Sequence, residues 1–162
     1  MPRIDSEVRI IPSVLDRLVD HEPEISREPP ASRAKSLRLL KMSVRRDLEW
    51  LLNTRQFIDE VPEDLKEVRK SVALYGLPDF TAANVKSSTD QLQMRRVIQE
   101  AIREFEPRLS NVRVTVEPGR NGERALHFRI DALLRVDPAP EPVTFDSTLH
   151  LYNGQYTISG EA

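Results

Sequence analysis

The sequence predicts an α+β fold in which N-terminal helices pack on one face of a C-terminal four-stranded antiparallel sheet. Two observations favour this class. Apolar residues recur at helical spacing as far as residue 105, and from residue 111 onward they occupy every second position. Helices that precede all the strands, without alternating with them, are typical of an α+β domain.

The composition fits one soluble domain. The chain has 162 residues, of which 39% are hydrophobic and 31% charged, and its formal net charge is −2. The even charge balance argues against a nucleic-acid-binding face, and the absence of cysteine excludes thiolate chemistry. Without an apolar run of membrane-spanning length, a signal-peptide core or a glycine-rich phosphate loop, we expect a cytoplasmic protein with no membrane insertion and no cofactor.

Residues 1–31 predict an N-terminal arm, and residues 32–162 a single domain. Within the arm, residues 13–19 suit a short helix with Val14, Leu15 and Leu18 on one face, and the prolines of residues 21–30 indicate a linker. The short helix either packs on its own domain or docks on a partner helix, and the two readings have equal support.

Three helices are predicted in the domain. The first begins after the capping residue Ser32 and ends near residue 53, and the second spans about residues 63–75 and stops at Gly76. The third begins near Ser88, which forms a capping box with Gln91, and ends before residue 107. Their apolar stripes are Leu37, Leu40, Val44, Leu48 and Leu51; then Leu65, Val68 and Val72; then Met94, Val97, Ile98, Ala101, Ile102 and Phe105.

Four strands follow in the alternating region. They are predicted near residues 111–117, 126–136, 143–151 and 156–158, with turns at residues 118–122 and at Asn153-Gly154. A meander of this kind has two edge strands. The last strand, with Tyr156, Thr157 and Ile158, either offers an open edge to a strand of another protein or is protected by its short length and charges.

The turn after the third helix brings together Glu106, Pro107 and Arg108. Arg108 either caps the carbonyl groups at the helix end while Glu106 faces water, or the proline fixes an acid–base pair that a partner binds. A hydrolase would use Glu106 as a general acid, but no second carboxylate is marked by its surroundings. His127, His150 and Asp146 do not have the spacing of a known zinc site, so we expect no metal.

Several segments, in order along the chain, resemble the TssE family of type VI secretion baseplate subunits. They are residues 12–18 (PSVLDRL), 43–55 (SVRRDLEWLLNTR), 75–79 (YGLPD), 136–138 (VDP) and 145–147 (FDS). The motif at residues 106–108 (EPR) is similar to one shared with the wider family of contractile-phage baseplate wedge proteins.

This resemblance implies a non-enzymatic part of a contractile injection machine. It implies that Glu106, Pro107 and Arg108 bind the wedge core proteins TssF and TssG, with TssK as a further candidate partner. Val14, Leu15 and Leu18 would form a second docking element. The strand with Tyr156, Thr157 and Ile158 would start the sheath of TssB and TssC.

Two other functions stay open. Because the family has also been labelled lysozyme-like, a peptidoglycan hydrolase is the main alternative. An adaptor that binds the wedge but not the sheath is the other. For the substitution Arg108→Ala, we expect lost wedge association with little loss of stability.

Overall fold

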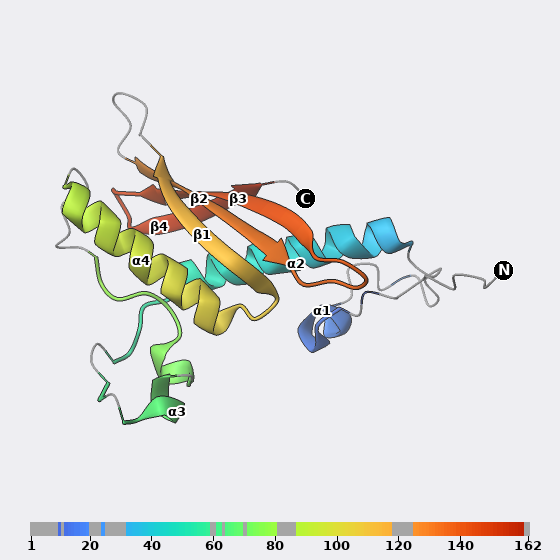
Figure 1. Ribbon diagram of the computed structural model, residues 1–162, viewed down its shortest axis with the longest axis horizontal. Coiled ribbons are helices and arrows are strands. Elements are labelled where there is room, and N and C mark those ends of the chain that lie inside the picture. The colour runs from blue at the N-terminus through green and yellow to red at the C-terminus, as the bar shows by residue number, and fades with distance from the viewer. Residues whose placement is uncertain are drawn as a thin grey trace.

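The helices come first and the strands last, which confirms the predicted α+β class (Figure 1). The computed structural model describes residues 10, 12–19, 24, 32–58, 61–62, 64–69, 71–80, 87–117 and 125–160. The helices are α1 (Val14–Leu18), α2 (Arg33–Asn53), α3 (Lys66–Arg69), the 3₁₀ turn η1 (Val72–Leu74) and α4 (Ser88–Phe105). The strands are β1 (Leu109–Glu117), β2 (Ala125–Leu134), β3 (Glu141–His150) and β4 (Gln155–Gly160).

The strands form an antiparallel meander in the order β1-β2-β3-β4, so β1 and β4 are the edges. The register places Val114 opposite Ile130. In the last pair, Ser147 lies opposite Ile158. One irregularity interrupts the first pair between Ser110 and Arg113.

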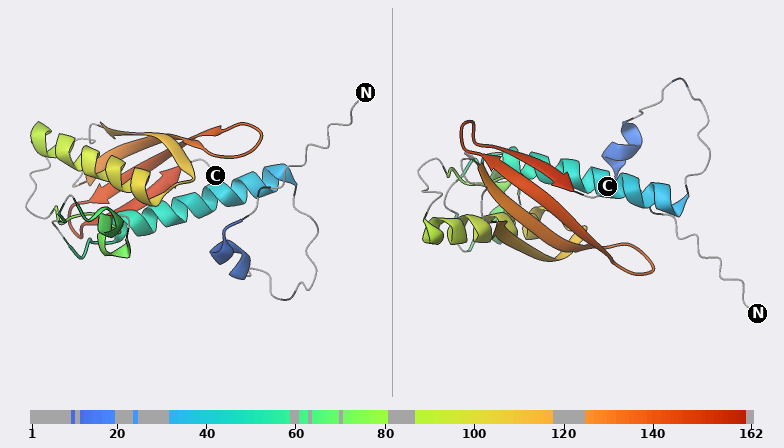
Figure 2. Two further views of the ribbon diagram at one scale, coloured as in Figure 1. Left: turned by 60° about the horizontal axis from the view of Figure 1, so that its bottom comes forward. Right: turned by 90° about the horizontal axis from the view of Figure 1, so that it is seen from above.

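One face of the sheet packs on α2 and α4, and the other carries the polar residues of the alternating pattern (Figure 2). Apolar side chains of β2 such as Phe128 and Ile130 are buried, whereas Arg129 between them is exposed. The helices contribute the predicted stripes, with Val44, Leu48, Met94 and Ile98 among the buried residues. The core therefore lies between the two long helices and the sheet.

The long helices begin as their sequences predict, with a shift of one residue in α4. Ser32 caps α2, and its Oγ accepts a hydrogen bond from the Lys35 N–H at 3.3 Å. In α4 the cap is Ser87 rather than Ser88, because the Ser87 Oγ accepts from the Asp90 N–H at 3.3 Å.

The predicted helix over residues 63–75 is wrong. Within that range the structure has the single turn α3 and the turn η1, and Val72 is exposed rather than buried. Ser71 separates the two, because it has extended backbone angles and its Oγ accepts a hydrogen bond from the Ala73 N–H. Glu63 and Lys70 lie outside the described residues.

The predicted stop after this segment is confirmed. Gly76 has a φ of +114°, and a Cβ at this position would lie 2.3 Å from the Thr54 carbonyl oxygen. Leu77 is buried, and its N–H donates to the Thr54 carbonyl at 2.8 Å. The close approach fixes the chain against the end of α2.

The β3–β4 hairpin is present, but its connection is longer than the two residues Asn153-Gly154. Residues 151–154 form the turn, so Leu151 lies outside the strand that was predicted to include it. The Gly154 N–H donates to the His150 carbonyl at 2.8 Å, and Gly154 has a φ of 68°. The predicted turn at residues 118–122 and, apart from residue 24, the linker at residues 21–30 lie outside the described residues.

Among the helices in the described ranges, none is both long enough and apolar enough to cross a bilayer.

Candidate functional site

The turn between α4 and β1 holds Glu106, Pro107 and Arg108 beside the middle of α2. The last turn of α4 closes with the Glu106 N–H donating to the Ile102 carbonyl at 2.9 Å. The Leu109 N–H donates back to the Glu106 carbonyl at 3.1 Å. Pro107 is exposed between the two, where its missing N–H leaves no donor unsatisfied. The backbone of the turn is therefore fixed by both neighbouring elements.

Within the turn, Arg108 and Glu106 form a forked ion pair. The Arg108 Nε donates to Glu106 Oε1 at 2.6 Å, and the Arg108 Nη2 contacts Glu106 Oε2. The Arg108 backbone N–H also donates to Oε1, at 3.2 Å. Glu106 is only 3% exposed, so it does not face water as one of the two readings of this motif held. Its carboxylate depends on the guanidinium in place of solvent.

The same guanidinium ties the turn to α2. The Arg108 Nη2 contacts Asp47 Oδ2 at 2.5 Å, and the Arg108 Nη1 donates to the Ser43 Oγ at 3.1 Å. All the side-chain bonds described for Arg108 go to Glu106, Asp47 and Ser43, and none to a carbonyl of α4. The helix-capping reading of Arg108 is therefore wrong, and Arg108 joins two elements instead.

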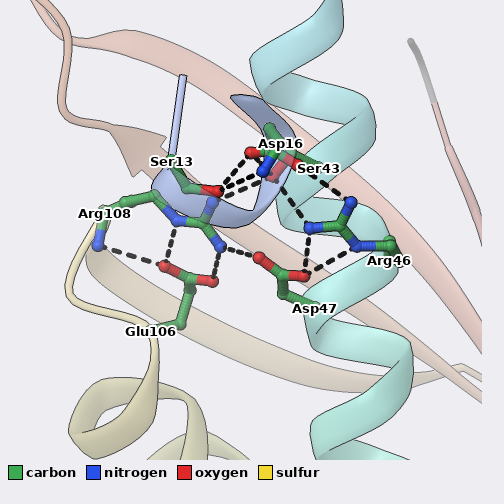
Figure 3. A network of polar contacts seen from close by, with 7 residues as sticks. All are labelled: Ser13, Asp16, Ser43, Arg46, Asp47, Glu106 and Arg108. Carbon is green, nitrogen blue, oxygen red and sulfur yellow. Dashed lines mark hydrogen bonds and ion pairs between the residues drawn. The ribbon is translucent and has the colours of Figure 1, made fainter. Parts of the chain in front are cut away.

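Next to this turn, α2 also holds the short helix α1 (Figure 3). The Asp16 Oδ2 accepts from the Ser43 Oγ at 2.7 Å and from the Ser13 Oγ at 2.6 Å. The Arg46 Nη1 pairs with Asp16 Oδ1 at 2.8 Å. Arg46 also reaches Asp47, with its Nε and Nη2 lying 2.9 and 2.8 Å from Asp47 Oδ1.

These contacts form a continuous series of alternating charges. It runs through Glu106, Arg108, Asp47, Arg46 and Asp16, and so contains three carboxylates and two guanidinium groups. We call these five residues, with Ser13 and Ser43, the charge ladder. Because three separate segments contribute to it, the ladder sets their relative positions.

Burial and pairing act in opposite directions on the ladder's ionisation. Burial alone would lower the pKa of Arg108, but the hydrogen bonds and charges of Glu106 and Asp47 outweigh it and raise the pKa. Burial would raise the pKa of Asp16, whereas hydrogen bonds from Ser13, Ser43 and Arg46 lower it to about 2. Both groups are therefore charged throughout the physiological range.

A pocket of about 390 Å³ opens beside the ladder. Aromatic side chains form part of its wall, and Tyr75 meets Phe105 edge to face with ring centroids 5.4 Å apart. Trp50 is 51% exposed, and the Arg46 guanidinium lies 4.9 Å from its ring centre. The lining residues are Ser13, Leu15, Asp47, Trp50, Leu51, Tyr75, Phe105, Glu106, Pro107 and Arg108.

The predicted apolar face of α1 is exposed. Val14 and Leu18 are 68% and 76% exposed, and Leu15 is 43% exposed at the pocket. No residue of α1 is buried, so polar contacts from Ser13 and Asp16 hold this helix in place. A five-residue helix with an unburied apolar face has little stability of its own.

The predicted strand residues lie elsewhere, on the edge strand β4. Tyr156 and Ile158 are buried with their side chains in the core, and Thr157 is exposed on the open face. Any partner at this edge would therefore meet the backbone rather than the two apolar side chains.

His127 and His150, the histidines that lie within the described residues, take part in polar contacts on the open face of the sheet. A ring nitrogen of His127 lies 3.1 Å from the Thr148 Oγ1, and one of His150 lies 3.0 Å from the Thr157 Oγ1. Across the part of the chain that the structure describes, no group of three or more His, Cys, Asp or Glu residues is arranged to hold a metal ion.

The sequence reasoning missed the part of the ladder on α2. It assigned no individual role to Ser43, Arg46 or Asp47, which appear there only within the segment 43–55 that resembles the TssE family. A signal existed, because Ser43 and Asp47 are four residues apart and each directly precedes an apolar stripe residue, Val44 or Leu48. They therefore form a polar row at the margin of the buried face.

Comparison with known proteins identifies the family. The model of the family described as "Baseplate wedge protein gp25" matches residues 38–139, which is more than half of the chain. The chain belongs to this family, which confirms the family expected from the sequence resemblance. No curated protein matches the chain.

A similar solved structure is described as "The baseplate complex from the type VI secretion system". It has 21% sequence identity to this chain and a TM-score of 0.46, and the match covers 68% of this chain and 93% of the other. Similarity at this level supports no conclusion about function.

Proposed function

We propose that the protein is a non-enzymatic subunit of a type VI secretion baseplate, located in the cytoplasm, which binds the wedge core and starts the sheath. Membership of the baseplate wedge family supports the structural role. The resemblance of the sequence to TssE points to TssF and TssG as the wedge partners, with TssK as a further candidate, and to TssB and TssC as the sheath partners.

The observation that favours wedge docking is the surface beside the charge ladder. Pro107, Leu15 and Trp50 are exposed and line the pocket there, and Leu18 is exposed on the same short helix α1. The ladder holds the backbone of α1 and of the turn in fixed positions, so a partner would lose little conformational entropy by ordering them. Exposed apolar side chains around a pocket suit an apolar segment of another protein.

Co-purification with TssF and TssG tests this docking. We expect Leu15→Asp combined with Leu18→Asp, or Trp50→Ala, to reduce wedge association at least about fivefold, because changing a central interface residue can cost more than about 1 kcal/mol. The ladder does not use these side chains for its ion pairs, so the free chain should unfold at nearly the wild-type denaturant concentration.

Phe57→Asp provides the matched control. Phe57 is 90% exposed but does not line the pocket beside the ladder. The control should bind as the wild type does. Unchanged association of both site variants would contradict the proposed docking surface.

The geometry of Glu106 supports the non-enzymatic part of the proposal. A general acid must direct a protonated oxygen at the leaving group. Here Glu106 is buried, and both of its oxygens contact the Arg108 guanidinium. A glycosidic oxygen would have to displace this pairing to reach Glu106.

The sheath role is proposed for the edge of β4. An edge strand can accept a further strand through its backbone groups, and Lys residues on such a strand prevent this pairing. We therefore expect Thr157→Lys with Ser159→Lys, both on exposed positions of β4, to block sheath assembly while wedge binding continues. Electron microscopy of sheaths and wedge co-purification measure the two effects.

The other edge strand supplies the control for this experiment. Thr115→Lys, on an exposed position of β1, should leave sheath assembly intact. If sheaths form normally with the β4 variant, the protein is an adaptor that binds the wedge alone.

A further inference from the structure

The side chain of Asn53 bonds to the outer edge of the sheet. Asn53 is the last residue of α2, and its Oδ1 accepts from the Tyr156 N–H of β4 at 2.8 Å. Its Nδ2 donates to the Tyr156 carbonyl at 2.9 Å, and also to the Glu49 carbonyl at 2.9 Å. A residue of a neighbouring antiparallel strand would make the same pair of bonds to Tyr156. The amide therefore takes the place of one added-strand residue.

Only part of the β4 edge is occupied in this way. Along an antiparallel strand, the backbone groups of alternate residues point to the same side. Since Tyr156 points away from β3, Ile158 and Gly160 present their N–H and carbonyl groups to that side as well. Among the described residues, no side chain or backbone group bonds to these outward groups of Ile158 and Gly160.

The opposite edge is engaged by α4. The Gln99 Oε1 accepts from the Val114 N–H at 3.2 Å, and the Arg103 Nη2 donates to the Val112 carbonyl at 3.1 Å. These are neighbouring outward positions in the middle of β1, so a strand added there would displace both side chains. The two edges therefore differ, and within the described ranges β4 retains adjacent outward positions without a partner.

We propose that Asn53 is a register stop, which limits an added sheath strand to the part of β4 from Ile158 onward. This inference rests on the proposed sheath role of β4. A strand that continued to Tyr156 would break two hydrogen bonds in order to make two of the same kind, with no net gain. It would also leave the Asn53 amide without these partners.

The point at which the added strand ends matters, because the pairing register decides which of its side chains lie on each face of the sheet. A shift of one residue moves every side chain of a strand to the opposite face. A stop at Tyr156 removes the shifted pairings that extend past Ile158. Fewer positions would thus be open to the first sheath strand, which later subunits could copy.

Hydrogen exchange resolved to single amides tests the stop, with the full-length chain alone and bound to the purified TssB–TssC complex. In the wild type, sheath binding should protect the amides of Ile158 and Gly160, while the Tyr156 amide exchanges at the same rate with and without sheath. Added protection at Tyr156 in the wild-type complex would overturn the stop. This measurement needs no variant and so does not depend on the folding of one.

Asn53→Ala provides the second measurement. We expect the Tyr156 amide of the free variant to exchange at least about tenfold faster than in the wild type, because its acceptor is gone. In the sheath complex of the variant, the Tyr156 amide should become protected, because the added strand now extends by one position. A Tyr156 amide that stays protected in the free variant, or unprotected in its complex, contradicts the inference.

Two controls separate this inference from the proposed function. Asn53→Asp keeps an acceptor for the Tyr156 N–H, so its free-chain exchange at Tyr156 should stay near the wild-type rate. Gln99→Ala frees the Val114 N–H on the other edge and should not change the protection of β4 by the sheath.

If the wild-type complex protects neither Ile158 nor Gly160, the sheath role of β4 fails, and the register stop fails with it. If it protects them while the Asn53 variants behave otherwise than expected, only the stop fails.

Discussion

Two arginines of this protein each lie between two carboxylates, but in different surroundings. Arg108 contacts Glu106 and Asp47 at the α4–β1 turn, where the exposed fraction of its side chain is 25% and that of Glu106 is 4%. Arg129 pairs with Glu117 at 2.9 Å and with Asp146 at 3.3 Å on the open face of the sheet, where all three side chains are at least 38% exposed.

The difference shows that burial, rather than the number of ion pairs, decides what an arginine contributes. Water screens the pairs of Arg129 and can replace the guanidinium as the donor to either carboxylate when the arginine is absent. No water can take this role at Glu106, because its carboxylate is buried in the folded protein. The buried cluster therefore positions segments of the chain, whereas the exposed cluster covers a solvated surface.

The largest expected effect is that of Arg108→Ala on stability. Removing one partner of a buried pair costs about 3–5 kcal/mol, and here it leaves Glu106 uncompensated. The structure thus replaces the expectation from sequence that this change costs little stability. Urea denaturation of the purified chain measures the loss. Arg108→Lys keeps the charge but not the forked geometry and should cost less. A loss below about 1 kcal/mol for Arg108→Ala would show that the two arginines are equivalent.

The next effect is a release of α1 in acid. The pKa of Asp16 is about 2 in the folded protein, compared with 3.8 for an unperturbed Asp. The Asp16 carboxylate therefore contributes fully to the docking of α1 on α2 above pH 3.8. It is lost as the pH falls from 3.8 toward 2, because the unfolded segment then binds the proton more readily.

Hydrogen exchange of the α1 amides across this pH range measures the release. Rates must be corrected for the pH dependence of intrinsic exchange. In Asp16→Asn the protection should be weak and independent of pH over the same interval. An equally pH-dependent α1 in that variant would mean that another carboxylate controls its docking.

The smallest effect is expected from Arg129→Ala. Its exposed pairs are screened, so the urea midpoint should stay close to that of the wild type, and added salt should change it little further. A destabilisation as large as that of Arg108→Ala would remove the distinction between the two clusters.

Much of the fold was predictable from sequence. The stripe of α2 and the capping residue Ser32 defined the first long helix, and the alternation of residues 126–134 defined β2. The segment from 63 to 75 was mispredicted, because a weak stripe of three residues was not enough to continue a helix through Ser71.

The candidate site was only partly predictable. The motif of Glu106, Pro107 and Arg108 was visible as a turn, but its partners were not. Arg108 meets Asp47 and Ser43 across 61 and 65 residues of sequence. The sequence marks Ser43 and Asp47 only as a polar row beside the apolar stripe of α2, and that row does not show that Arg108 is their partner.

The sequence alone determined the two long helices, the four strands and the family to which the chain belongs. These properties follow from local capping and from hydrophobic periods that are written along the chain. Only the tertiary structure decided which polar groups meet, such as Asp16 with Ser43, or Asn53 with Tyr156 across 103 residues. The sequence pattern around a polar side chain does not show which residue it will contact, because that contact depends on how the whole core packs.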